Sequence, residues 1–550
     1  MGIYANFREG LQAFSPQERR NIIIYIAGIM VYKFGLEAFN GSVVALATNR
    51  YDFESIRDKT PSQTFERVGL LTGLNQAFQC VGSILIAPLV KRFATKNVLS
   101  CAILVFGLCT TLLLIIDAAT GGTFMPAAFH NNHPKNSWPY YGTYNTDAMI
   151  PVYCVSGIAY GMVELIRRVI PRDIVGGNVQ KLRRLDSIVH IFYEITGTAG
   201  AFTTGLVIIP RLGNNMAFII TPVCFAVSAT VWFFISELDF QRESTTTATR
   251  GLRKKPVYWK AAFSGLYLFG ESIWVGCRIL FSSRKFIWLV PGYAVALYAH
   301  RYLENGIAPQ VARRYLGDSA WAQIMVGGSN LGELLGALCV LLFTGVIQTP
   351  MPWLRLDALM LLIVWYIPYW RPPVEQVGQA WIVAATFTPI SFGWAAGDVS
   401  LAAYIQASLT RLESKNKNVS ALGAVMAFLY SFYIVTYAIA GTLLGRYLDG
   451  VYNETGGNNG GSISGGLVYT AGLQFSLICV LVLASTFVPK GSLAFNPSMI
   501  SEEKLGGLDP MEDKVPTTPD SIGKSRQRKE YRNSDDGSAV NVPKSVCELV

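Results

Sequence analysis

The sequence is poor in charged residues. Of its 550 residues only 15% are Asp, Glu, Lys or Arg, whereas about a quarter of an ordinary globular domain is charged. Hydrophobic residues make up 51% of the chain, which together with the charge deficit argues against a set of soluble domains. The formal net charge is +10, but Lys and Arg cluster in alternate loops, as membrane orientation requires. We therefore expect no nucleic-acid partner.

The usual residue patterns for metal and nucleotide chemistry are also missing. The chain has four histidines and nine cysteines, without a Cys-x-x-Cys pair or a Cys/His cluster spaced for zinc. The pair His130 and His133 is too sparse for a catalytic metal site. A Gly-x-x-x-x-Gly-Lys-Ser/Thr loop is absent too, which argues against an ATP-driven pump. We expect no cofactor, no metal site and no enzyme activity.

Long apolar runs are what the chain has in quantity. A membrane-spanning helix needs about 20 predominantly apolar residues, and about a dozen such runs fall into two sets of six around a basic middle segment. The first run is preceded by a polar segment and is itself of spanning length, so no cleavable signal is expected. The predicted spans are 22–48, 68–90, 96–118, 148–168, 188–210 and 215–236, then 285–303, 319–346, 353–370, 378–405, 420–446 and 466–488.

Loop charges orient these spans. The loops after spans 2, 4 and 10 and the middle segment are rich in Lys and Arg, whereas residues 119–147 contain only Lys135 and residues 447–465 contain neither. Positive loops stay on the cytosolic side. We therefore expect both termini in the cytosol of a multi-pass protein, in the plasma membrane or the vacuolar membrane. Asn453, in the sequence Asn-Glu-Thr, is then a glycosylation acceptor on the outer side.

The predicted organisation has five parts. They are a cytosolic tail (1–21), a six-helix bundle (22–236), a cytosolic linker (237–284), a second six-helix bundle (285–489) and a disordered cytosolic tail (490–550). Within the linker, residues 257–283 could pass as a further span, but the polar residues fall on one narrow arc. A helix with such a stripe suits the membrane interface. The stripe contains Lys260, Ser264, Tyr267, Glu271, Arg278 and Ser282.

The two halves resemble each other in their polar and glycine patterns. In spans 1 and 7 a cation is followed within one turn by Glu, with Asn soon after, and spans 4 and 10 each carry two glycines four residues apart. Other glycines at the same spacing predict close helix packing. The sets are Lys33, Glu37 and Asn40 against Arg301, Glu304 and Asn305; Gly157 and Gly161 against Gly393 and Gly397; then Gly328, Gly332 and Gly336, with Gly441 and Gly445.

This arrangement resembles the major facilitator superfamily. The loop after span 2 matches that family's motif at Leu89, Arg92 and Lys96, but Lys91 stands where the family has Asp. The run 197–205 is similar to the glycine-rich antiporter motif without its proline. The resemblance implies an all-α membrane protein of two six-helix bundles related by pseudo-two-fold symmetry. It also implies that spans 1, 4, 7 and 10 line a central cavity.

The ionisable residues inside the spans are the candidate functional residues. A charge at the bilayer centre costs about 2.5–3.5 kcal/mol on insertion scales, so such charges are usually paired and functional. Lys33 and Glu37 lie on one helix face, where they either neutralise each other structurally or line the cavity. Arg301 and Glu304 repeat this arrangement, unless they lie near the outer interface. Asp398 has no charged neighbour within four residues and is, beside Glu37, the leading proton-coupling candidate.

Five further residues are candidates for a proton relay or for gating. Glu164 precedes Arg168 by four residues near one end of span 4, a spacing that also suits a structural ion pair. His190 and Glu194 are four residues apart, and histidine titrates near physiological pH, although it is often merely hydrogen-bonded. Glu333 lies within the glycine run of span 8.

These patterns favour a secondary active transporter that moves a small molecule by alternating access, coupled to protons. We favour efflux of a small organic compound, with metal-ion transport or nutrient uptake as alternatives. A second function class is a non-transporting receptor or scaffold with a transporter fold. A membrane enzyme is the third and would need a clustered catalytic constellation. The expected partners are the substrate, protons and the lipid bilayer, with the chain as a monomer.

Overall fold

The computed structural model describes residues 14–494 except 91–92, 131–137, 176–178, 237–257, 283, 344–345, 348, 410–420 and 490. Throughout these residues the regular structure is helical, without strands. The all-α class is therefore confirmed. Several sequence predictions fall outside the described residues, namely the tail beyond residue 494 and the basic residues Lys91, Arg92 and His133.

The helices of the first half and of the middle segment follow the chain in order. They are α2 (Pro16–Arg57), α3 (Thr64–Val90), α4 (Thr95–Ala119), η1 (Ala127–Phe129), η2 (Thr146–Ala148), α5 (Met149–Val175), α6 (Val179–Thr203), η3 (Thr204–Ile208), α7 (Ile209–Leu212), η4 (Ala217–Ile219) and α8 (Ile220–Phe233), followed by α10 (Tyr258–Ser282) and α11 (Arg284–Ile287).

The second half contains several helices in which α-helical and other helical turns alternate. Its elements are η5 (Val290–Val295), α12 (Ala296–Tyr302), η6 (Leu303–Ile307), α13 (Ala308–Arg314), η7 (Ser319–Trp321), α14 (Ala322–Phe343), α15 (Met351–Met360), η8 (Leu361–Tyr369), α16 (Val377–Leu409), α17 (Ala421–Glu454), η9 (Gly457–Asn459), α18 (Ser464–Leu467), η10 (Val468–Leu473) and α19 (Gln474–Ser485).

Local sequence explains where the first long helix begins. The Ser15 side chain accepts a hydrogen bond from the Glu18 amide, and the Glu18 carboxylate accepts one from the Ser15 amide. Pro16 follows the cap at a position where its missing N–H costs nothing. This capping box satisfies amides that would otherwise lack partners at the helix start. From there α2 runs 42 residues without interruption, well beyond the predicted span 22–48.

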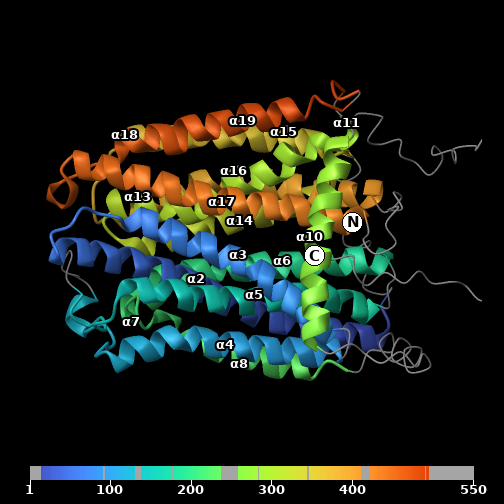
Figure 1. Cartoon of the computed structure of the whole chain (residues 1–550), viewed down its shortest axis with the longest axis horizontal. Helices are drawn as coiled ribbons and strands as arrows, with labels where there is room; N and C mark the ends of the chain where they lie inside the picture. Colours follow the sequence, from blue (N-terminus) through green and yellow to red (C-terminus); the bar gives the residue numbers. More distant parts are fainter. Residues whose placement is uncertain are drawn as a thin grey trace, which may run out of the picture.

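The long helices lie side by side and pack around two large hydrophobic cores, and a small third cluster joins Ala45, Ile208, Ile209 and Ala217 of the first half to Ala320 of the second. One core draws on residues from Phe14 to Ile235, and the other on residues from Leu280 to Val482. In Figure 1 the first half (blue to green) lies below the second half (yellow to red). Each half therefore buries most of its apolar side chains in its own core, as a bundle must.

The predicted spans coincide with helices. Among the described residues, nine helices are long and apolar enough to cross a membrane, and the shorter Ala217–Phe233 is apolar as well. The two remaining spans fall on the continuous helix from Val290 to Arg314 and on α16. The chain is therefore a multi-pass membrane protein. The helix at 290–314 extends 11 residues past the predicted end of span 7, and this shift in boundary places Arg301 about halfway along it.

Helix α10 differs from the others in direction. It runs across the long helices instead of beside them (Figure 1). It packs on both halves, since Tyr258 donates a hydrogen bond to the Leu85 carbonyl of α3 and Gly276 lies against the Ala424 backbone of α17. This crossing defines one end of the bundle, called here the α10 end. The opposite end, where α2 leads into α3, is called the far end.

The halves meet along two helix pairs, α6 with α14 and α3 with α17. Glycine permits the close approach in the second pair: a Cβ at Gly69 would lie 2.4 Å from the Gly441 carbonyl oxygen, and one at Gly445 would lie 2.2 Å from the Phe65 carbonyl oxygen. The predicted packing role of Gly445 is thus visible in the structure. By contrast, Gly328, Gly332 and Gly336 pack α14 on α16 within the second half.

Candidate functional site

Lys33 and Glu37 form an ion pair on α2. Their Nζ and Oε1 atoms are 2.5 Å apart, and the two residues are only 8% and 7% exposed. The glycines of α6 make room for them, because a Cβ at Gly197 would lie 2.5 Å from Lys33 Cε and one at Gly200 would lie 3.1 Å from Glu37 Cβ. The glycine run of span 5 therefore serves to seat this pair between α2 and α6.

Arg301 and Glu304 form the corresponding pair in the second half. Arg301 Nη1 lies 2.8 Å from Glu304 Oε2, and the other carboxylate oxygen accepts a hydrogen bond of 2.7 Å from Ser329 of α14. Ser329 in turn contacts the Ser391 hydroxyl on α16 at 2.6 Å. Glu304 lies in the π-helical segment η6, a feature often found at functional sites. The Arg301 side chain is 44% exposed although it lies halfway along its helix.

Arg301 has electrostatic partners in both halves of the protein. Its electrostatic partners come from four elements: Glu304 of η6, Glu333 of α14, Tyr433 of α17 and Tyr160 of α5 in the other half. Arg301 therefore lies about halfway along its helix, beside groups of both halves.

Glu194 and Glu333 join the two ion pairs into one cluster. Glu333 of α14 interacts electrostatically with Glu194 of α6, with Glu304 and Arg301, and with Lys33. Of these, Glu194 is 3% exposed, and its Oε2 atom has no hydrogen-bond partner among the described residues. The cluster thus combines carboxylates and cations from both halves where α6 packs against α14.

The remaining candidates of α5 and α6 lie beside this cluster. Glu164 pairs with Arg167 at 2.5 Å and accepts a hydrogen bond from Tyr32. The Tyr193 ring contacts both Arg167 and Lys33, whose charged groups lie 4.5 and 4.4 Å from the ring centroid. His190 Nδ1 is 4.0 Å from Glu194 Oε1. The side chain of Arg168 lies outside the described part of the chain.

Two further candidates are Asn40 and Asp398. Asn40 of α2 accepts a hydrogen bond of 3.2 Å from the Tyr153 hydroxyl of α5. Asp398 is half-buried on α16, one helical turn beyond Trp394. Neither position tests the roles expected for these residues.

At the far end, an ion cluster that the sequence analysis missed joins the two halves. Asp52 of α2 accepts hydrogen bonds from Arg313 Nε at 2.6 Å and from Arg314 at 2.7 and 2.9 Å. Thr64 adds a fourth hydrogen bond, of 2.5 Å. The only sequence signal was that charges fall near the ends of two helices, which is typical of any span.

A second far-end contact lies between α3 and α17. The Asp449 carboxylate accepts hydrogen bonds from the amides of Phe65 and Glu66, at 2.8 and 2.9 Å, in the first turn of α3. A carboxylate suits this position, because the first amides of a helix lack internal partners. Asn453, the predicted glycosylation acceptor, forms two hydrogen bonds of 2.9 Å with the Ser62 backbone.

The second half also contains a buried His–Asp pair that the sequence analysis did not identify. His300 Nε2 lies 2.9 Å from Asp357 Oδ1, and the two side chains are 2% and 0% exposed. The imidazole stacks on Trp394 at a centroid distance of 5.0 Å. His300 and Asp357 are 57 residues apart, so no local pattern could have paired them.

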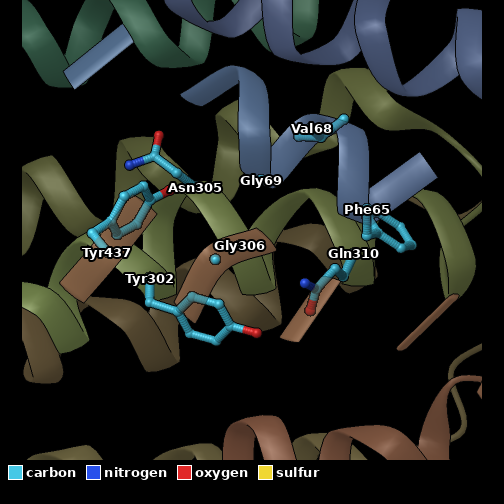
Figure 2. Close-up of a pocket in the computed structure, with 9 residues that line it drawn as sticks. Phe65, Val68, Gly69, Tyr302, Asn305, Gly306, Gln310 and Tyr437 are labelled. Carbon is cyan, nitrogen blue, oxygen red and sulfur yellow. The ribbon is translucent and has the colours of Figure 1, made fainter. Parts of the chain in front are cut away.

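A narrow pocket lies between the two halves, beside the Arg301–Glu304 pair. Figure 2 shows Phe65, Val68 and Gly69 of α3 facing Tyr302, Asn305, Gly306 and Gln310, with Tyr437 of α17. Asn305 adjoins Glu304 in the chain and donates a hydrogen bond of 3.1 Å to the Arg301 carbonyl. The pocket therefore borders the η6 segment that carries the second ion pair.

Comparisons with known proteins identify the fold. No protein-family model and no curated protein sequence matches the chain. Among solved structures, PepTSo2 in a tetrameric crystal form has a TM-score of 0.53 and 11% identity over 86% of this chain and 97% of its own. The partially occluded, inward-open xylose transporter XylE from E. coli has a TM-score of 0.51 and 12% identity over 84% of this chain and 98% of its own. A proton-dependent oligopeptide transporter has a TM-score of 0.52 and 11% identity over 87% of this chain and 98% of its own. The chain therefore has the fold of the major facilitator superfamily, as its sequence predicts.

Proposed function

We propose that this protein is a secondary active transporter that couples the movement of a small molecule to protons. The observation that carries the proposal is the cluster of Lys33, Glu37, Glu194, Glu333 and the Arg301–Glu304 pair, where the two halves meet. Buried charges are costly and are retained where function needs them. The solved structures with this fold include proton-dependent transporters, which supports the same conclusion.

Alternating access is the mechanism we propose. The halves are tied at the far end by the Asp52 cluster and by Asp449, so this conformation is closed there. Rocking of one half against the other would break these contacts and expose the central cluster to the far side. Protonation of its carboxylates would change the relative stability of the two conformations, which is how a proton gradient could drive the cycle.

The finer proposals concern cargo, sidedness and modification. We propose export of a small organic compound, with the α10 end in the cytosol, α10 at the membrane interface and Asn453 glycosylated outside. Uptake of a nutrient is the alternative direction. A receptor or scaffold with this fold is the competing function class, and it would tolerate neutralisation of the central carboxylates. An enzyme is not favoured.

A flux assay on the full chain tests the proposal. A ligand found by thermal-shift screening would be followed in proteoliposomes with and without an imposed pH gradient. We expect a pH gradient to accelerate flux, and Glu37→Gln and Asp398→Asn each to reduce it while membrane abundance stays unchanged. Glu454→Gln, which removes an exposed carboxylate at the end of α17, is the control. Wild-type flux in both variants would remove these carboxylates from the coupling mechanism.

A further inference from the structure

We propose that the cargo is a protonated organic amine, which binds at Glu194 and Glu333 in exchange for protons. This inference rests on the proposed transporter function and specifies the substrate class of the same site. It starts from the charge of the cluster. Two of the four carboxylates, Glu37 and Glu304, have their own cation in Lys33 and Arg301. Among the described side chains, Glu194 and Glu333 have no Lys or Arg at ion-pair distance.

Two carboxylates without a Lys or Arg partner in a largely buried site require compensation. Moving a carboxylate out of water costs several kcal/mol unless a partner or a proton neutralises it. Glu333 and Glu194 also repel each other, since each lies in the electrostatic range of the other. The site can therefore hold about two positive charges, supplied either by protons or by a cationic ligand. Because both neutralise the same groups, binding of one displaces the other.

Unpartnered polar atoms indicate what kind of cation fits. Within the described part of the chain, Glu194 Oε2 is a buried acceptor without a donor, and Asn330 Nδ2 on α14 is a buried donor without an acceptor. Asn330 Nδ2 would lie 3.3 Å from a Cβ at Gly197, beside Lys33. An ammonium group has the N–H donors that Glu194 lacks, and an oxygen elsewhere on the ligand could accept from Asn330.

Aromatic groups around the cluster also favour a cation. The Tyr193 ring already contacts Lys33 and Arg167, and rings attract positive charge through their faces. A bare divalent metal is less suitable, because the described residues contain no group of three or more His, Cys, Asp or Glu side chains that could hold one. Hard cations require several oxygen ligands. The site therefore favours an organic cation over a metal ion.

Exchange with protons depends on all titratable groups around the two carboxylates, not only on those of α6 and α14. The groups come from six helices and include His190, whose side chain is 37% exposed and whose Nδ1 lies 4.0 Å from Glu194 Oε1. They are Lys33 and Glu37 of α2; Tyr160, Glu164 and Arg167 of α5; His190, Tyr193 and Glu194 of α6; Arg301 and Glu304 of α12 and η6; Glu333 of α14; and Tyr433 of α17.

Proton release on binding is the direct test. The purified full chain in weakly buffered detergent solution would receive phenethylamine, tyramine, putrescine or spermidine, with 2-phenylethanol and 3-phenylpropionate as neutral and anionic controls. We expect at least one amine to bind with release of protons, and its Kd to rise by up to about tenfold per unit fall in pH for each proton exchanged. The controls should bind weakly and release none.

Two variants locate the effect. Glu194→Gln and Glu333→Gln should each lower the number of protons released and weaken amine binding about tenfold or more, whereas Glu454→Gln should match wild type. The wild-type measurement decides the question even if a variant fails to fold. If no amine releases protons, or if 2-phenylethanol binds equally well, the amine inference is overturned. Flux of a neutral or anionic compound driven by a pH gradient would then still support the transporter function, and absence of any gradient-driven flux would contradict both.

Discussion

Asp52 and Arg314 form a bidentate ion pair across the two halves, with oxygen–nitrogen distances of 2.7 and 2.9 Å. Arg313 shares the same carboxylate. Three charges so deeply buried depend on one another, because removing one partner of such a pair leaves a charge without compensation. Typical costs are about 3–5 kcal/mol. Loss of the Asp52 charge would therefore leave both guanidinium groups without this carboxylate.

Asp52→Asn is expected to loosen the far end. The variant keeps the shape of the side chain but leaves two guanidinium groups without a carboxylate. We expect faster hydrogen–deuterium exchange in peptides covering 50–66 and 311–320, together with a lower Tm in detergent.

Asp58→Asn is the matched control for this variant. The Arg57 hydrogen bond lowers the pKa of Asp58, so the control also removes a full negative charge at neutral pH. Asp58 is exposed and pairs with its chain neighbour Arg57 at the end of α2, and surface pairs contribute little. Equal exchange in Asp52→Asn and Asp58→Asn would show that the buried cluster does not hold the halves together.

A double-mutant cycle on Lys33 and Glu37 separates a structural role from a transport role. Lys33→Gln and Glu37→Gln each leave a buried charge unpaired, so both should lower the Tm, and the double variant should recover part of that loss. We expect pH-gradient-driven flux to remain reduced by about tenfold or more in the double variant, although its Tm recovers. Such a loss corresponds to about 1.4 kcal/mol. If flux recovers together with the Tm, the pair has only a structural role.

The fold could be predicted from the sequence because its signals are local. Spans follow from runs of apolar residues, and the Lys33–Glu37 pair follows from a spacing of four on one helix. The same holds for Arg301 and Glu304, three residues apart. Local spacing could not show how far along its helix each pair lies. The helix from Val290 to Arg314 continues past its apolar stretch, which moved Arg301 from a predicted span end to mid-helix.

The contacts between halves could not be predicted, because they join residues far apart in the chain. Asp52 and Arg314 are separated by 262 positions, and each alone reads as an ordinary charge near a helix end. The relation of Glu194 to Glu333 is of the same kind, since it exists only once α6 packs against α14. A pattern search along one chain has no access to such pairs.

Substitutions of glycine should distinguish contacts between the halves from contacts within one half. A Cβ at Gly69 would meet the Gly441 carbonyl of the other half at 2.4 Å, whereas one at Gly332 would meet Thr388 of the same half at 2.2 Å. Overpacking of this kind costs about 1–3 kcal/mol. We expect Gly69→Ala and Gly332→Ala to lower the Tm to a similar extent.

The two glycine variants should differ in their flux per folded molecule. Only Gly69→Ala forces the halves apart, so it should change flux beyond what its loss of folded protein explains. Gly450→Ala on α17 is the control, because a Cβ there has no neighbour within 4 Å. An equal change of flux in Gly69→Ala and Gly332→Ala would mean that the α3–α17 contact is not specific to the transport cycle.

The His300–Asp357 pair gives a last prediction, which concerns stability. His300→Ala removes the imidazole from between Asp357 and Trp394, leaving a cavity and a buried carboxylate without that partner. A loss of about 2–4 kcal/mol is expected from these two effects together. His300→Gln, whose amide can donate to Asp357, should lose less. His130→Ala, at an exposed loop position, should leave the Tm unchanged. If both His300 variants unfold at the wild-type temperature, the pair does not stabilise the second half, and its burial would need another explanation.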